Sequence, residues 1–320
     1  SGKVTLRLQA KIMNTSDFSG NIKCTVESPT SIDVVFDEVS EKTVPVTVDT
    51  SGVSVADNYM LNRTAAVPAE VTLRGPTSEL DRISAVVAPI TTDTALADTT
   101  TLPANLEMRD ENGTVVTPLY TTMDNGSANV TLTIYQVREL PLSVNFIGIP
   151  KGFDVNSLKY TLSQQTLRVA GSARTISALD TLAVTDFDLA QEFELDRDYQ
   201  RLIELPAGVV SLDGATNVTL SFDTDNLAST KLNVSNIRAI NVPSNYELEI
   251  LSSLVSGVEL YGPADEIQDL SADSVLAQID CQSLNLTAGQ QTIPVTIQIP
   301  ASSRIFATGS YTVQCEITVK

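Results

Sequence analysis

The chain has 320 residues, with 39 acidic against 20 basic side chains, a formal net charge of −19, and neither His nor Trp. The lack of His excludes His-based catalytic triads, zinc sites and proton shuttles, and the negative charge argues against binding to nucleic acid or anionic membrane. Because 42% of the residues are hydrophobic, the chain should fold, and its length suggests two to three domains of about 100–200 residues each.

Alternation of apolar and polar residues predicts β-strands along most of the chain. The clearest runs are at 44–48, 71–74, 130–134, 218–222, 295–299 and 311–319. Turn-forming pairs lie between such runs at Asn112-Gly113, Asn125-Gly126 and Asp213-Gly214. No long 3.6-residue period is present, so we expect a mostly β fold.

An internal repeat is the most informative feature of the sequence. Three times, a predicted strand ends in Gly followed by Pro or Ser, with apolar residues five and eight positions after the Gly, which is the spacing of one face of a short helix. The Gly is expected to allow a tight strand-to-helix corner. The motif residues are Gly75, Pro76, Leu80 and Ile83, then Gly171, Ser172, Ile176 and Leu179, and finally Gly262, Pro263, Ile267 and Leu270.

The glycines lie roughly 90–96 residues apart, and a similar strand precedes each one by about 30 residues. The N-terminal stretch matches the closing half of a repeat, with strands expected at 21–26 and 32–36. We therefore predict a partial repeat at 1–38 and complete repeats at 39–136, 137–226 and 227–320. The short linkers predict that these small β domains, each with one short helix, stack into an elongated rod.

Motifs of catalysis and cofactor binding are missing. There is no Ser-x-x-Lys pair, no Gly-x-Ser-x-Gly elbow and no Gly-rich phosphate loop, so we expect no catalytic residue, no metal and no cofactor. The three cysteines, Cys24, Cys281 and Cys315, form no Cys-x-x-Cys motif. They suit half-buried strand positions, although Cys281 and Cys315 could also pair.

One acidic stretch allows two interpretations. Its carboxylates alternate with apolar residues, which is typical of a strand with one charged face in water, and a calcium-binding edge is the alternative. Paired carboxylates could also serve a hydrolase, although the low aromatic content leaves few platforms for a sugar. The residues are Asp186, Asp188, Glu192, Glu194, Asp196 and Asp198.

The repeat resembles the YbbR domain. The resemblance rests on an opening strand at 43–48, a turn at 49–52, and the stretch 68–76, which runs from Pro68 through a strand to Gly75-Pro76. The middle repeat departs from the pattern, with Ser172 after Gly171 in place of Pro. The resemblance implies small β-rich domains without catalytic residues. It also implies the arrangement of YbbR proteins, which carry several such domains outside the cytoplasm behind one N-terminal transmembrane helix.

In Firmicutes, the best-understood proteins of this family, those of the CdaR type, regulate a membrane-bound diadenylate cyclase that makes cyclic di-AMP. We therefore expect a non-catalytic, extracytoplasmic regulatory region with this cyclase as partner, a possible cell-envelope ligand, and no nucleic-acid partner. No apolar run reaches the ~18–20 residues of a membrane span, so the single-pass anchor is expected to precede this sequence. A cell-surface β-repeat scaffold or adhesin-like spacer is the alternative, and a carboxylate-based hydrolase is the third possibility.

Overall fold

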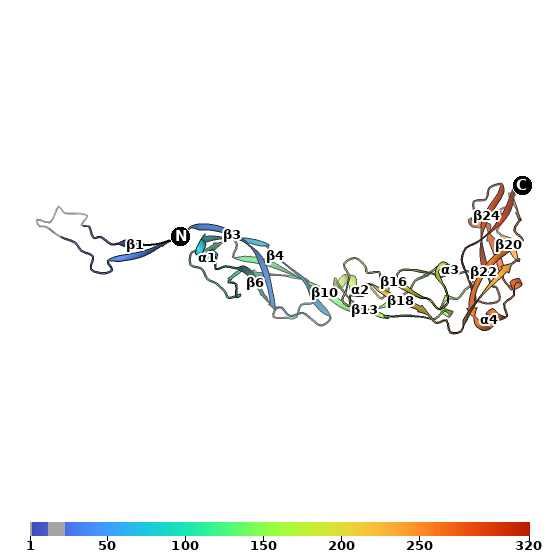
Figure 1. Ribbon diagram of the computed structural model, residues 1–320, viewed down its shortest axis with the longest axis horizontal. Coiled ribbons are helices and arrows are strands. Elements are labelled where there is room, and N and C mark those ends of the chain that lie inside the picture. Colours follow the sequence, from blue (N-terminus) through green and yellow to red (C-terminus); the bar gives the residue numbers. More distant parts are fainter. Residues whose placement is uncertain (1, 12–22) are drawn as a thin grey trace. The chain divides into compact units, whose positions relative to one another are not determined.

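The computed structural model describes residues 2–11 and 23–320, which form two compact units, Ser1–Gln136 and Val137–Lys320 (Figure 1). The prediction of a mostly β fold is confirmed, because short strands dominate both units and the four α-helices of the described residues have only four or five residues each. Helices this short are not stable alone, so each depends on the strands around it.

The described residues of unit 1 contain one helix, and their strands form three groups. The central sheet has the order β8-β6-β3-β5-β9, β1 pairs with β2, and β4 and β7 flank the first part of β10. The elements are β1 (Gly2–Arg7), β2 (Ser31–Phe36), β3 (Val39–Gly52), β4 (Tyr59–Val67), β5 (Glu70–Pro76), α1 (Thr77–Leu80), β6 (Ala85–Thr91), β7 (Thr100–Asn105), β8 (Glu107–Arg109), β9 (Thr122–Met123) and β10 (Ser127–Ser143).

The N-terminal hairpin differs from the expectation. Residues 23–26 do not form the expected strand, and 21–22 lie outside the described residues. Instead β2 pairs with β1, where Val4 faces Val34 and Leu6 faces Ile32 across the antiparallel pair. The alternating apolar residues of β1 give β2 apolar neighbours on one face, which is how cross-strand pairs stabilise a sheet.

Strand β3 organises the central sheet of unit 1. Its first half pairs antiparallel with β5 and its second half pairs parallel with β6. The chain between the parallel strands β3 and β6 passes through β4, β5 and α1, which gives the long crossover that a parallel connection requires. Val44, Leu73, Ile83 and Val86 fill the core of this sheet, each at most 5% exposed.

Unit 2 repeats this pattern twice. In its first part, the end of β10 pairs with β13 (Thr166–Gly171) and, in parallel, with β14 (Leu182–Ala183). In its second part, β19 (Leu227–Val234) pairs antiparallel with β22 (Val255–Pro263). There β20 (Ile237–Ile240) pairs in parallel with β23 (Leu276–Asp280). Each of the three segments also has a closing antiparallel pair: β7 with β10, β16 with β18, and β24 with β26. The predicted repeat boundaries after 38, 136 and 226 stay predictions.

The segment 137–226 contains two helices, α2 and α3, rather than the single helix expected of each repeat. Its elements after β10 are β11 (Phe146–Ile147), a 3-10 turn (Val155–Ser157), β12 (Tyr160–Leu162), β13 (Thr166–Gly171), α2 (Ala173–Ser177), β14 (Leu182–Ala183), β15 (Phe187–Asp188), α3 (Leu189–Glu192), β16 (Asp198–Leu202), β17 (Val210–Ser211) and β18 (Asn217–Phe222).

The segment 227–320 forms a five-stranded sheet of order β20-β23-β24-β26-β21 and a three-stranded sheet β19-β22-β25. Its elements are β19 (Leu227–Val234), β20 (Ile237–Ile240), β21 (Tyr246–Ile250), β22 (Val255–Pro263), α4 (Ala264–Gln268), β23 (Leu276–Asp280), β24 (Gly289–Gln298), β25 (Phe306–Thr308) and β26 (Tyr311–Val319), with 3-10 turns at Ala272–Ser274 and Cys281–Ser283.

An aromatic cluster joins the two segments of unit 2. Phe193, from the segment 137–226, lies with its ring centroid 5.1 Å from that of Tyr261 and 5.0 Å from that of Phe306, both from the segment 227–320. Phe153 adds a second ring against Phe306, at 4.5 Å. Such edge and tilted contacts between buried rings stabilise beyond the area that they bury. The two segments therefore share one core.

Replacing Phe193 tests this shared core. Phe193 is 2% exposed, so Phe193→Ala should lower the free energy of unfolding of unit 2 by about 3–5 kcal/mol. Hydrogen exchange followed by mass spectrometry should show lost amide protection in both segments. Leu202→Ala is the control, because Leu202 is 60% exposed and should change stability little. Lost protection confined to residues 137–226 would contradict a shared core.

Candidate functional site

The three predicted corners are the first candidate site. In unit 1, β5 ends at Gly75-Pro76, and the following turn of helix places Leu80 and Ile83 in the core, 2% and 1% exposed. Pro76 stands just before the first helical residue, where its missing N–H leaves no hydrogen bond unmade.

The corners of unit 2 have the same order. After Gly171, the Ser172 hydroxyl caps α2 by accepting a hydrogen bond from the Thr175 N–H, a side-chain cap that proline cannot supply. Ile176 is fully buried and Leu179 is half-buried against the same core. The third corner has Gly262-Pro263 before α4, with Ile267 buried and Leu270 half-buried.

The glycines serve a different purpose from the one expected. None of Gly75, Gly171 and Gly262 has a positive φ, so the corner itself does not need glycine. Instead, a returning segment of chain lies against each one. A Cβ on Gly75 would lie 2.7 Å from the Cα of Thr121, and one on Gly262 would lie 2.8 Å from Cγ1 of Ile305. The requirement is close backbone approach.

A carboxylate fixes the returning segment, and the sequence analysis did not identify it. Four positions after Gly75, the Glu79 carboxylate accepts hydrogen bonds from the Leu119 and Tyr120 N–H groups and, at 2.8 Å, from the Thr121 hydroxyl. Four positions after Gly262, Glu266 accepts from the Ser302 hydroxyl and forms an ion pair with Arg304. The shared offset from the glycine is the signal that could have revealed both.

The hydrogen bonds change the acidity of Glu79. Partial burial alone would raise its pKa, but the bonds from the Thr121 side chain and from the backbone N–H groups of Tyr120 and Leu119 outweigh burial, and the pKa lies below its ordinary value of 4.5. The ionised form of Glu79 is therefore the form that the folded corner favours.

A cation at the other end of the helix is a second feature that the sequence analysis missed. The Lys42 ammonium donates to the carbonyl oxygens of Leu80 and Ile83, at 3.3 and 2.7 Å. Arg138, at the same offset from its glycine, donates to those of Ile176 and Leu179, at 3.4 and 2.6 Å. Cations favour helix C-termini, where carbonyl groups lack partners. In the third corner the corresponding residue is Thr230, which pairs with Leu260 as Lys42 pairs with Leu73.

The acidic stretch 186–198 is not the single strand that we expected. Asp188 caps α3 and Asp196 has a φ of 57°, a left-handed turn conformation that Asp tolerates, so the chain forms a strand, a helix and a turn. Each acid has a partner within the chain: Asn145 for Asp186, the Ala190 N–H for Asp188, Arg201 for Glu192, Arg197 for Glu194, Thr224 for Asp196 and Ser221 for Asp198.

Other candidate chemistry is sparse. All three cysteines are free thiols, with Cys24 exposed and Cys281 and Cys315 buried in one core. Burial raises the pKa of both buried thiols, which makes them less reactive. In residues 2–11 and 23–320, no group of three or more Cys, Asp or Glu side chains is arranged to hold a metal ion. No helix of the described part is long and apolar enough to cross a membrane.

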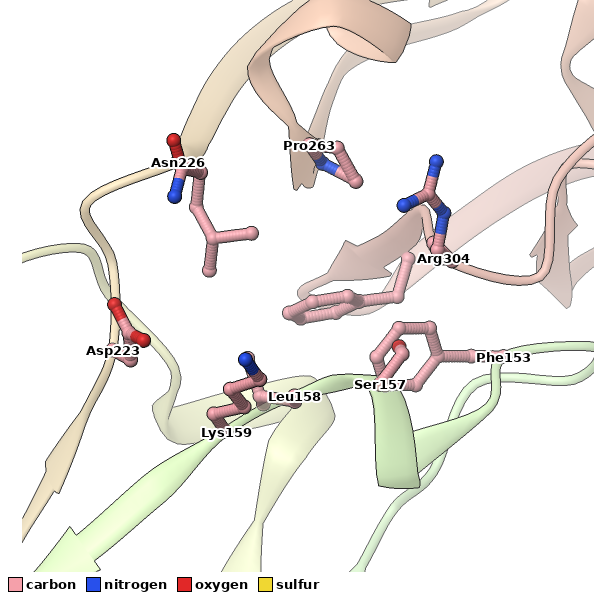
Figure 2. A pocket seen from close by; sticks show the side chains of 10 residues that line it. Phe153, Ser157, Leu158, Lys159, Asp223, Asn226, Pro263 and Arg304 are labelled. Carbon is pink, nitrogen blue, oxygen red and sulfur yellow. The ribbon is translucent and has the colours of Figure 1, made fainter.

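A hollow of about 180 Å³ lies between the two segments of unit 2. Its apolar lining includes Phe153, Leu158 and Phe306, and Figure 2 shows Asp223 on one side and Arg304 on the other. The volume is below the ~300 Å³ at which small-molecule pockets begin, and Arg304 is already paired with Glu266. The hollow suits a single side chain better than a substrate or cofactor.

Substituting Gly75 tests the close approach. Gly75→Val should lower the melting temperature, since the new side chain would overlap the backbone of Thr121 and overpacking costs about 1–3 kcal/mol or more. Gly126→Val is the matched control, because a Cβ there meets nothing within 4 Å. An unchanged melting temperature for Gly75→Val would show that the returning segment does not need the glycine.

Glu79→Gln tests the carboxylate through its pH dependence. Because the folded-state pKa is lowered, the ionised group adds stability above the unfolded value of 4.5, and this stability is lost as the pH falls through the folded-state pKa. At pH 7 the variant should melt at a lower temperature than the wild type, and the gap should close at acid pH. Glu70→Gln, an exposed carboxylate on β5, is the control. A gap that stays constant with pH would refute the assignment.

Comparison with known proteins places part of the chain in a family. The family model of YbbR-like proteins matches residues 44–134. A crystal structure of a YbbR-like protein from Streptococcus pneumoniae is 13% identical, with 59% of this chain and 96% of that chain covered and a TM-score of 0.26. Among curated proteins, none matches. Residues 44–134, which hold β3, α1 and the Gly75 corner, are therefore a YbbR-like domain.

Proposed function

We propose that this chain is the non-catalytic, extracytoplasmic region of a membrane-anchored protein that modulates a diadenylate cyclase, and so the synthesis of cyclic di-AMP. The observation that carries the proposal is the YbbR-like domain at 44–134, because regulation of this cyclase is the activity associated with the CdaR type of that family.

The use of the polar residues supports a binding role over catalysis. Glu79 and Glu266 hold returning segments of their own chain, and Glu192 is paired with Arg201. A carboxylate-based hydrolase needs two acids that converge on a cleft large enough for a substrate. The acids of 186–198 instead bind partners on neighbouring elements of unit 2.

Regulation without chemistry requires differential binding. A partner shifts the equilibrium between active and inactive cyclase only as far as its affinities for the two forms differ. A domain with a rigid surface loses little conformational freedom on binding and so converts more of its contact energy into affinity. The corners of both units offer such a rigid surface, because hydrogen bonds within the chain already hold their returning segments in place.

Cyclic di-AMP output tests the proposal. The diadenylate cyclase of the same organism would be expressed in a heterologous host, with and without the membrane-anchored protein that contains this chain. We expect output to change at least twofold, in either direction, at equal cyclase levels. The anchor without this chain is the control and should leave output unchanged. No change, with membrane insertion verified, would contradict the proposal and favour the surface scaffold.

A further inference from the structure

The surface around α1 carries an exposed apolar pair on a rigid support. Leu119 and Tyr120 are 78% and 69% exposed, more than almost any other large apolar side chain of the described residues. Their backbone is not loose, because the Glu79 carboxylate holds both N–H groups and the adjacent Thr121 is 8% exposed against Gly75. Rigid, exposed apolar side chains of this kind are typical anchors of protein interfaces.

The fold does not require this apolar pair. The third corner also has a glycine, a returning segment and a carboxylate four positions after the glycine, although Glu266 binds the side chains of Ser302 and Arg304 and not backbone N–H groups. Ser303 and Arg304 stand there where unit 1 has Leu119 and Tyr120. Both third-corner residues are exposed and polar. Since one of the two otherwise similar corners does without apolar side chains, Leu119 and Tyr120 need an explanation outside the packing of unit 1.

Acidic groups lie on both sides of the same helix. At its start, the Thr77 N–H donates to the Glu38 carbonyl oxygen and the Ser78 N–H donates to the Asp37 carboxylate, which brings this acidic pair to α1. At its end, a hollow of about 560 Å³ is lined by three acids, Asp81, Asp110 and Glu111, and by two bases, Lys42 and Arg82. Acidic side chains therefore outnumber basic ones around this hollow, and the Lys42 ammonium donates to helix carbonyl oxygens.

We propose that Leu119 and Tyr120, with the acids around α1, form a docking surface for a protein that presents an apolar cleft flanked by Lys or Arg side chains. Charge complementarity selects this occupant. An anionic membrane or a second copy of this chain would bring negative charge against an already acidic surface, in a chain with 39 acids against 20 bases. The inference does not require the partner to be a diadenylate cyclase.

Photo-crosslinking and affinity test the surface in the anchored protein. A photoreactive amino acid at Tyr120 should crosslink one protein, and the same amino acid at Ser303 is the matched control. The partner would then be purified, and its affinity measured for the wild type and for Leu119→Ser with Tyr120→Ser. We expect at least a tenfold loss of affinity in the variant, an unchanged melting temperature, and weaker wild-type binding at higher salt.

Several outcomes would overturn the inference. Crosslinking at Tyr120 no stronger than at Ser303 would do so, as would a crosslink to lipid or to a second copy of the chain. An identified partner that binds the double variant within twofold of the wild type, or whose binding is insensitive to salt, would also overturn it. A partner other than the cyclase would leave this inference standing while the proposed function fails.

Discussion

The close approach of a returning segment to one glycine is the constraint on which each corner depends. At Gly75 and Gly262 the space for a Cβ is taken by Thr121 and Ile305, and at Gly171 the carbonyl oxygen of Gly208 would lie 3.0 Å from it. The returning segment can therefore cover the start of a very short helix. That cover holds the apolar face of the helix in the core, which the helix could not maintain alone.

Polar side chains stabilise the close packing of helix and returning segment that the glycine allows. A four-residue helix leaves nearly all of its backbone groups without partners inside the helix. Lys42 and Arg138 satisfy carbonyl groups after two of the helices, and Ser172 caps the start of one. Glu79 and Glu266 lie on their helices and accept hydrogen bonds from the returning segments. Each corner is thus a small network in which helix, strand and loop position one another.

The sequence predicts the features that depend on local pattern. Period-two alternation and the spacing of Leu80 and Ile83 after Gly75 indicate a strand followed by a short helix, because both signals lie within about ten residues of chain. The reason for the glycine was missed, because Thr121 lies 46 residues away and no residue near Gly75 indicates this contact. The stretch 186–198 was wrongly predicted for a different, local reason, because helix capping by Asp188 competes with its regular strand pattern.

The comparison of corners also separates scaffold from function. A residue that recurs at the same offset, such as Glu79 and Glu266 or Lys42 and Arg138, has a packing or hydrogen-bonding reason visible in each copy. A residue that changes freely on the same support has no such reason. The Leu119 position, where the third corner has Ser303, is of the second kind. In a chain built from similar corners, the specificity of binding to a partner must come from such variable positions, because the side chains at the recurring positions already stabilise the fold.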